Sequence, residues 1–467
     1  MSESSLFGIV ISLNDSLPTF TTSSRLSGYA AITAVQTARF DEAQITLEGC
    51  SRIIVEPTAP IAQTRGINAK HVFLKLAMPI DESEYPPSHI AEPGKTYNFA
   101  FNFVIPERLP LSSCSHRCAG PHVQQAHLHL PPSMGDGGFT PLYPTKFTRK
   151  IEYAIYAKVL QFRGADYKAG IVASDSKELR FIPATSEEPP IYIQPSDSDY
   201  SFIRTKNMKK GRFKGKLGEF TLSAEQPMPF QVSPISSTPA TITVTLKVRF
   251  DPLDPSYEPP RVGKLTTKIK ISTVFATRAF PDLPKRCPIG TAYDQERCGS
   301  LVIFPLLTMS INFSSLWAPY HSSDSGIEPA PPYPDETPQN IHLTQSTSQP
   351  GRGSHNAKIL VPITLPSSKQ WLPTFHCCLV SRFYTLEFSL AVQSPGNRGF
   401  STWVLRLPVQ VSSSILSRTV EVATGSAGEG GSIQSSPMSE RPSEAFFRSR
   451  TLPGQADEEP PGYELIV

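Results

Sequence analysis

The chain has 467 residues, of which 39% are hydrophobic, so it can form two or three domains with sizeable cores. Its formal net charge of +3 argues against a dedicated nucleic-acid-binding protein, which usually carries a strong basic excess. The seven cysteines, an odd number that includes the adjacent pair Cys377 and Cys378, do not indicate a disulfide framework. Because the sequence shows no signal-peptide pattern and no apolar run of about 18 residues, we expect a soluble, cytoplasmic protein.

In chain order, the patterned segments alternate apolar and polar residues with a period of two. A strand with one buried and one solvent-facing side needs this alternation, and no long helical periodicity competes with it. Many such strands, separated by turns rich in proline, glycine, serine and aspartate, predict an all-β protein built from β-sandwiches. The clearest strand segments are 97–103, 151–159, 240–250, 264–271 and 384–393.

Composition divides the chain into four parts. The strands of 1–183 predict a first domain, and the proline-rich, then basic, range 184–219 predicts an interdomain linker. A second domain is expected at 220–413, interrupted by a polar, low-complexity insertion at 318–356. The tail, 414–467, is rich in serine, glycine, glutamate and proline. We expect both the insertion and the tail to be disordered, because such compositions bury too little apolar surface to fold.

Four segments resemble the arrestin family. In the first domain these are 94–113 (GKTYNFAFNFVIPERLPLSS), 129–135 (HLPPSMG) and 150–159 (KIEYAIYAKV), which are similar to an arrestin N-domain. In the second domain, 372–390 (LPTFHCCLVSRFYTLEFSL) is similar to a strand pair of an arrestin C-domain. The order of these segments along the chain resembles the fungal α-arrestin-like proteins most closely.

The resemblance implies two arrestin-like, immunoglobulin-type β-sandwich domains joined by a hinge. It also implies an adaptor that links cytosolic segments of plasma-membrane transporters or receptors to a WW-domain, HECT-type ubiquitin ligase. Such an adaptor promotes ubiquitination followed by endocytosis or sorting, and works in the cytoplasm and transiently at the plasma membrane or endosomes. The alternative within the same fold is a scaffold for signalling or vesicle-coat proteins that recruits no ligase.

A peptide of the PPxY type, which we expect to recruit the ligase, is present at Pro460, Pro461 and Tyr463, after three acidic residues. Two prolines bias the chain to polyproline II, so little conformational entropy remains to be lost on binding. The proline rings fill an aromatic-lined groove of a WW domain, and the tyrosine reaches a neighbouring pocket. These three residues are the predicted WW-binding site.

A second sequence of the same form comprises Pro189, Pro190 and Tyr192, also after an acidic pair. It is a second candidate WW-binding site, and the alternative is that 191–193 pack as a short strand. Two accessible sites would allow tandem WW domains to bind bivalently. A look-alike ending at Tyr333 lacks the first proline and is not expected to bind.

Thr451 is a candidate phosphorylation site, because 448–453 (RSRTLP) fits the pattern R-S-x-[ST]-x-P. Phosphate there would add negative charge and acceptor oxygens for an arginine cluster such as that of a 14-3-3 protein. A phosphate reader bound this close to Tyr463 would block the ligase sterically. The alternative is ordinary serine- and arginine-rich tail composition.

A cluster of seven basic residues is a candidate contact with an anionic membrane surface, at about 1 kcal/mol for each nearby lysine or arginine. The alternatives are a solvated hinge and a set of lysines that accept ubiquitin. Nucleic acid is not expected, because no aromatic platform accompanies the charge. The residues are Arg204, Lys206, Lys209, Lys210, Arg212, Lys214 and Lys216.

Cys114, His116, Cys118 and His122 lie within nine residues of one another, and the spacing C-x₃-C-x₃-H supplies three of the four ligands that zinc takes. No second closely spaced cysteine pair completes the set. The sequence therefore predicts an ordinary loop, with no metal site and no cofactor.

The sequence carries no recognisable enzyme signature. The sequence contains no H-E-x-x-H, G-x-S-x-G or G-x-G-x-x-G pattern, and its acidic and basic residues are scattered. We therefore expect no catalytic activity. A β-sandwich enzyme or ligand-binding domain is the remaining alternative, and a pocket with converging, perturbed carboxylates or histidines would indicate it.

Overall fold

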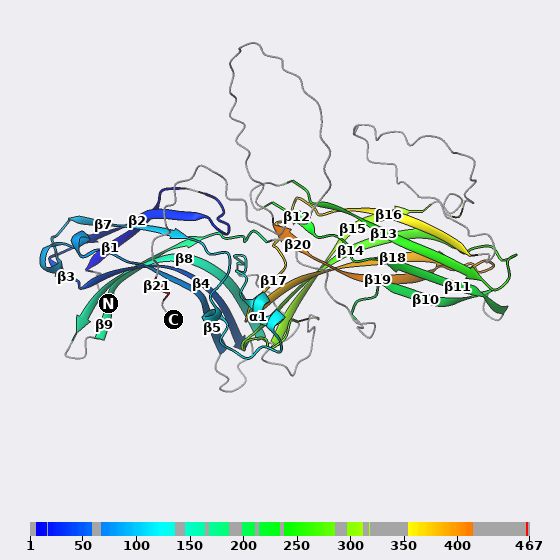
Figure 1. The fold of residues 1–467 in the computed structure, drawn as a ribbon, viewed down its shortest axis with the longest axis horizontal. Coiled ribbons are helices and arrows are strands. Elements are labelled where there is room, and N and C mark those ends of the chain that lie inside the picture. Colours follow the sequence, from blue (N-terminus) through cyan, green and yellow to red (C-terminus); the bar gives the residue numbers. More distant parts are fainter. Residues whose placement is uncertain are drawn as a thin grey trace, which may run out of the picture. The chain divides into compact units, whose positions relative to one another are not determined.

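The expected all-β class is confirmed, because strands dominate the described residues and form several sheets (Figure 1). Within them the one α-helix is α1, Pro121–His127, and three short 3₁₀ helices are η1 (Glu82–Glu84), η2 (Pro87–His89) and η3 (Leu111–Ser113). None of these helices is long and apolar enough to cross a membrane. The computed structural model describes residues 6–15, 17–57, 67–135, 145–163, 168–185, 199–210, 214–233, 238–284, 297–311, 317, 354–413 and 464–465.

A first group of sheets comes mainly from the first part of the chain, and its strand pairs are antiparallel. A three-stranded sheet has the order β1 (Phe7–Leu13), β2 (Arg25–Ala34), β7 (Thr96–Val104). A five-stranded sheet has the order β21 (Glu464–Leu465), β5 (Ile67–Met78), β4 (Glu42–Pro57), β8 (Thr145–Arg163), β9 (Lys168–Leu179). Two short strands, β3 (Ala38–Arg39) and β6 (Ile90–Ala91), form a separate pair.

The apolar positions of these strands share one core, as the alternation predicts. In β7, the side chains of Phe99, Phe101 and Phe103 are buried, whereas Asn98 before them and Ala100 between them are exposed. Side chains of the five-stranded sheet belong to the same hydrophobic cluster. Two sheets that bury their apolar faces in one core have the character of a β-sandwich.

A second group of sheets has a core of its own. A four-stranded sheet has the order β10 (Ile203–Lys210), β11 (Lys214–Ala224), β13 (Thr241–Pro252), β16 (His355–Thr364). The facing sheet has the order β15 (Arg297–Ser310), β14 (Arg261–Ala276), β18 (Val380–Gln393), β17 (Phe375–His376), and β19 (Ser401–Val409) also pairs with β18. A parallel pair joins β12 (Phe230–Val232) to β20 (Val411–Ser413).

Cross-strand register explains this second core. Val244 on β13 lies opposite Val361 on β16, and both side chains are buried. From the other sheet, Trp403 on β19 packs edge-on against Phe220 on β11, with ring centroids 4.8 Å apart. Thr243 is exposed next to Val244, as a period of two requires.

A buried tyrosine fixes a proline-containing segment in each group. Tyr153 on β8 donates a 2.7 Å hydrogen bond from its hydroxyl to the carbonyl of Pro131. Tyr384 on β18 donates one of the same length to the carbonyl of Leu372. Each acceptor residue precedes a proline, which has no N–H to pair with the neighbouring chain. The segments that resemble arrestins, 129–135 with 150–159 and the two ends of 372–390, are therefore joined by direct contacts.

Parts of the expected domain organisation lie outside the described residues, and other parts differ in detail. The range expected as a linker, 184–219, contains β10 and the first half of β11, because Met208 and Leu217 anchor these strands in the second core. Most of the expected insertion, 318–353, lies outside the described residues, and β16 begins at His355. Of the tail, Glu464 and Leu465 form β21, which pairs with β5.

Candidate functional sites

The peptides predicted to bind partners lie outside the described residues. The nearest described segment is β21, which directly follows the PPxY sequence and pairs with Leu76 and Ala77 of β5. Their accessibility thus stays a prediction. The residues concerned are Pro460, Pro461 and Tyr463, Pro189, Pro190 and Tyr192, and Thr451.

The basic cluster lies on the hairpin of β10 and β11. Lys209 lies opposite Lys216 in the register, and the side chains on β10 from Arg204 to Lys210 are exposed, except that of Met208. Arg212 lies outside the described residues, and only the backbone of Lys214 is described. A two-stranded ribbon, rather than an irregular linker, therefore displays most of this positive charge.

Two lysines of this cluster contact aromatic rings. The ammonium of Lys206 lies 5.4 Å from the ring centroid of Trp403, and that of Lys210 lies 5.7 Å from the ring centroid of Tyr257. At these distances a cation is attracted to the ring face, and the aliphatic stem covers apolar surface. These two residues therefore contribute to packing as well as to surface charge.

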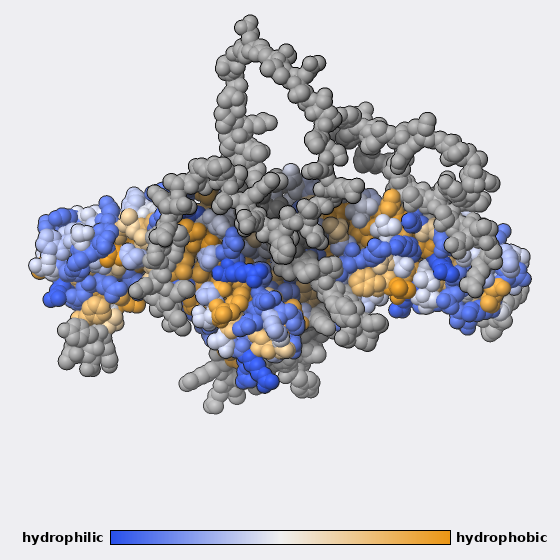
Figure 2. All heavy atoms as spheres, viewed as in Figure 1, coloured by the Kyte–Doolittle hydropathy of each residue, from blue (hydrophilic) through white to orange (hydrophobic). Residues whose placement is uncertain are grey.

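An edge strand carries exposed apolar side chains. Within the described part of the chain, β15 pairs with β14 on one side, which leaves backbone groups of its other side for another partner. Val302 is 41% exposed and Ile303 is 48% exposed on this strand. Proteins usually protect such an edge with charge or cover, so an apolar edge is a candidate surface for an added strand. On the face drawn in Figure 2, apolar areas are interspersed with hydrophilic ones.

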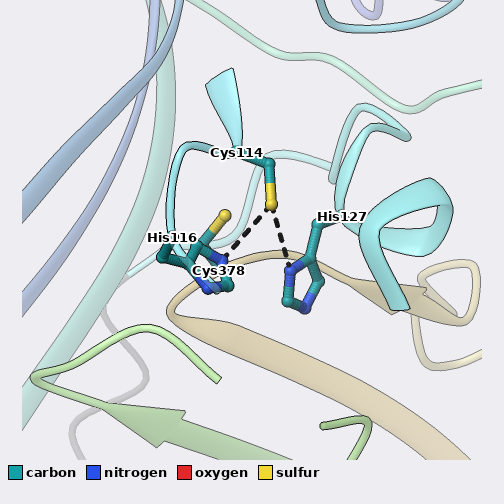
Figure 3. A group of neighbouring side chains, drawn as sticks. All are labelled: Cys114, His116, His127 and Cys378. Carbon is teal, nitrogen blue, oxygen red and sulfur yellow. Dashed lines mark hydrogen bonds between the residues drawn. The ribbon is translucent and has the colours of Figure 1, made fainter. Parts of the chain in front are cut away.

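A cluster of thiols and imidazoles was not expected from the sequence. Cys114 follows η3, His116 lies two residues later, and His127 is the last residue of α1. Cys378 comes from the other half of the chain, in the turn between β17 and β18. One ligand atom from each of these four residues lies within 4.8 Å of every other. Figure 3 shows the four side chains gathered at one point.

Helix geometry decides which histidine joins this cluster. The sequence pairs His122 with the two loop cysteines, but α1 places Val123 and His127, four residues apart, on its buried face. His122 is exposed, and His127 is only 1% exposed. Pro121 at the first helical position and Gly120 before it set the start of α1, and hence this phase.

The distances within the cluster are short. The Sγ atom of Cys114 lies 3.3 Å from Nε2 of His116 and 3.6 Å from Nδ1 of His127. The Sγ atom of Cys118 lies 3.7 Å from that of Cys114. The sulfur of Cys378 lies 3.9 Å from the backbone oxygen of Ser113.

Burial determines the protonation of these groups. Burial raises the pKa of the Cys114 thiol, and the nearby thiol of Cys378 raises it further. Burial raises the pKa of the Cys378 thiol to about 12 and lowers the pKa of the His127 imidazole to about 4. A nucleophilic cysteine needs the opposite shift, toward thiolate at neutral pH. The cluster is therefore poorly suited to covalent catalysis.

Three segments meet at this cluster. The N–H of Ala119 donates a 2.9 Å hydrogen bond to the carbonyl of Pro281, and the N–H of Phe280 donates one of 2.8 Å to the carbonyl of Cys378. The guanidinium of Arg149 lies 5.2 Å from the ring centroid of Phe275. The cluster thus links the loop after β7 to the ends of β14 and β17.

The adjacent cysteines were the sequence signal that could have identified Cys378. Because the vicinal pair cannot easily bridge to itself, it offers a thiol to a distant partner, but the sequence does not say which one. Compared with known proteins, the chain matches no protein-family model and no curated protein sequence.

Proposed function

We propose that this chain is an adaptor of the α-arrestin type, which brings a WW-domain, HECT-type ubiquitin ligase to cytosolic segments of membrane proteins. The observation that carries the proposal is the peptide Pro460-Pro461-Gly462-Tyr463 with its acidic flank. Its proline rings and tyrosine match the groove and pocket of a WW domain. Ubiquitination and then endocytosis or sorting of the bound membrane protein would follow from proximity.

The β architecture supports the arrestin-like part of the proposal. Two hydrophobic clusters, the first of which also takes in side chains of β14, β17 and β18, fit two sandwich domains. Segments that resemble arrestins are also neighbours in the structure. Met134 forms an isolated bridge with Ile151, next to the hydrogen bond between Tyr153 and Pro131. These segments therefore act as one structural unit in the first group.

The edge strand β15 is the surface we propose for the membrane protein's cytosolic segment. An extended segment added to β15 would pair with its outer backbone groups and place apolar side chains beside Val302 and Ile303. Pro305 interrupts the N–H groups along this strand, so the added strand would be short. Ile303→Lys should weaken binding of the cargo segment and leave WW-domain binding unchanged.

The chemistry belongs to the ligase in this mechanism. The adaptor's residues bind two partners at once and so raise the effective concentration of target lysines near the ligase. Tyr463 with its two prolines holds the ligase, and a sheet edge holds the cargo.

The experiment is binding of the full-length chain to a tandem WW-domain fragment, measured by calorimetry. Tyr463→Ala should abolish binding, because the tyrosine pocket is left empty. Tyr192→Ala, alone and combined with Tyr463→Ala, measures the contribution of the second candidate site. Tyr333→Ala is the matched control, since its sequence lacks the first proline and its removal should change nothing.

The outcomes distinguish recruitment through Tyr463, recruitment through Tyr192 and a scaffold that recruits no ligase. Unchanged binding by Tyr463→Ala, with loss in the double variant, would move recruitment to Tyr192. Absence of binding by the unsubstituted chain would refute ligase recruitment and favour the signalling or vesicle-coat scaffold.

A further inference from the structure

We propose that Cys114, His116, His127 and Cys378 bind a zinc ion in a closed, structural site. The four side chains converge from three segments (Figure 3), and their ligand atoms lie within 4.8 Å of one another. Two thiols and two imidazoles are a donor set that zinc takes in structural sites. The site is independent of the proposed adaptor function.

The two distances from the Cys114 sulfur to the imidazole nitrogens agree with a tetrahedron. With metal–ligand lengths of about 2.3 Å for sulfur and about 2.0–2.1 Å for nitrogen, neighbouring sulfur and nitrogen ligands lie about 3.6 Å apart. From the Cys114 sulfur, the observed separations are 3.3 Å to His116 and 3.6 Å to His127. Zinc could therefore be accommodated by small shifts of side chains already in place.

Neighbouring backbone groups orient the ligands. Nδ1 of His116 lies 3.3 Å from the carbonyl oxygen of Arg117, which can only accept a hydrogen bond. Nδ1 must therefore be the donor, and this leaves the lone pair of Nε2 directed at Cys114. Metal-binding histidines commonly donate their second nitrogen to a carbonyl in this way.

Burial explains why these polar groups need a ligand. Cys114 and Cys378 are each 2% exposed, and His127 is 1% exposed. The Nδ1 atom of His127 faces the sulfur atoms of Cys114 and Cys118, which are weak hydrogen-bonding groups. Burying an imidazole nitrogen with such weak partners is unfavourable. A coordinate bond from this Nδ1 to zinc would replace those weak contacts.

The donor set selects the metal class. Thiolates and imidazoles favour zinc over calcium or magnesium, which take oxygen ligands. Four protein ligands leave no open position for water, so the ion would stabilise structure rather than catalyse. On binding, the two thiols lose their protons to solvent and the imidazoles bind through their neutral nitrogens. Zinc would tie the loop after β7 to the turn between β17 and β18.

Cys118 and His122 provide matched controls. The Cys118 sulfur approaches that of Cys114, but it does not belong to the group of four whose atoms are all mutually close. His122 is exposed on α1, away from the buried face. Both residues lie in the same loop and helix as the proposed ligands. Their substitution therefore tests whether zinc depends on the four proposed ligands or on any cysteine and histidine nearby.

The test measures zinc in the full-length chain, purified without chelator, by elemental mass spectrometry. We expect about one zinc per chain in the unsubstituted protein, Cys118→Ser and His122→Ala. Cys378→Ser and His127→Ala should each contain clearly less zinc per chain, because loss of a ligand weakens zinc binding by at least about tenfold. Zinc retained equally in all variants, or lost with Cys118→Ser but kept with Cys378→Ser, would overturn the assignment.

Cobalt substitution keeps the test decisive if a ligand variant fails to fold. The unsubstituted protein, stripped of metal with a chelator and loaded with Co²⁺, should show the visible absorption of a tetrahedral site and a sulfur-to-metal charge-transfer band. It should also unfold at lower temperature after the chelator than before it, and recover on addition of Zn²⁺. Absence of both the cobalt spectrum and the zinc-dependent shift would refute the site.

Discussion

Replacing Tyr384 with phenylalanine removes one buried hydroxyl and leaves the ring in place. The hydroxyl donates a 2.7 Å hydrogen bond to the carbonyl of Leu372, and the residue is 2% exposed. The ring still packs against Trp371, at 6.2 Å between centroids, so no cavity of methyl size forms. The buried carbonyl of Leu372 therefore loses its hydrogen-bond donor, which should lower the free energy of unfolding by about 1–2 kcal/mol.

Urea unfolding followed by intrinsic fluorescence measures this loss. All three tryptophans, Trp317, Trp371 and Trp403, belong to the core that contains Tyr384. For a denaturant slope of about 2–3 kcal/mol per molar urea, we expect the midpoint to fall by about 0.3–1 M.

Tyr257→Phe is the control, because this half-buried side chain lies at a turn under Lys210. It should change the free energy of unfolding by less than about 0.5 kcal/mol. Equal midpoints for Tyr384→Phe and the unsubstituted chain would refute the reasoning, since the hydrogen bond would then contribute nothing.

Three further predictions concern charge, packing and the C-terminal strand. Burial alone would raise the pKa of Glu387, but hydrogen bonds from Lys270 (2.5 Å) and Arg406 (3.0 Å) outweigh it and hold the pKa below its usual value. A carboxyl with a lowered folded-state pKa stabilises the fold above its unfolded-state pKa and loses this effect as pH falls through the folded-state value. Glu387→Gln should therefore lower the free energy of unfolding by about 1–3 kcal/mol at pH 7. In acid, the urea midpoints of the variant and the unsubstituted chain should converge. A difference between the two midpoints that does not change with pH would contradict this explanation. Gly28→Ala should destabilise the first group of sheets by at least about 2 kcal/mol, because a Cβ there would overlap backbone of β1, and an unchanged melting temperature would contradict this. Deleting β21 and the two residues after it should change WW-domain affinity by less than about threefold. The reason is that a few backbone hydrogen bonds to β5 nearly cancel the entropy cost of ordering two residues. A larger increase in affinity, measured by calorimetry, would show that β21 makes the motif inaccessible.

Local pattern predicted the strands well, for a physical reason. A strand with one buried face repeats every two residues, so β7 and β13 could be recognised without knowing their neighbours. The basic cluster was harder to interpret. Its charges suggested a linker, but Met208 and Leu217 hold the hairpin of β10 and β11 against the second core. Two buried positions among many charges give too weak a periodic signal to identify an edge hairpin.

The sequence by itself determined the all-β class, and it supplied the PPxY peptide, whose expected recognition depends on four consecutive residues and on no fold. Only the tertiary structure decided the composition of the Cys/His cluster. The phase of α1 selects His127 over His122, and the path of the chain brings Cys378 to Cys114 from the other half of the molecule. Spacing rules describe ligands that are close in sequence. A site assembled across distant segments depends instead on sheet register and packing, which no local pattern encodes.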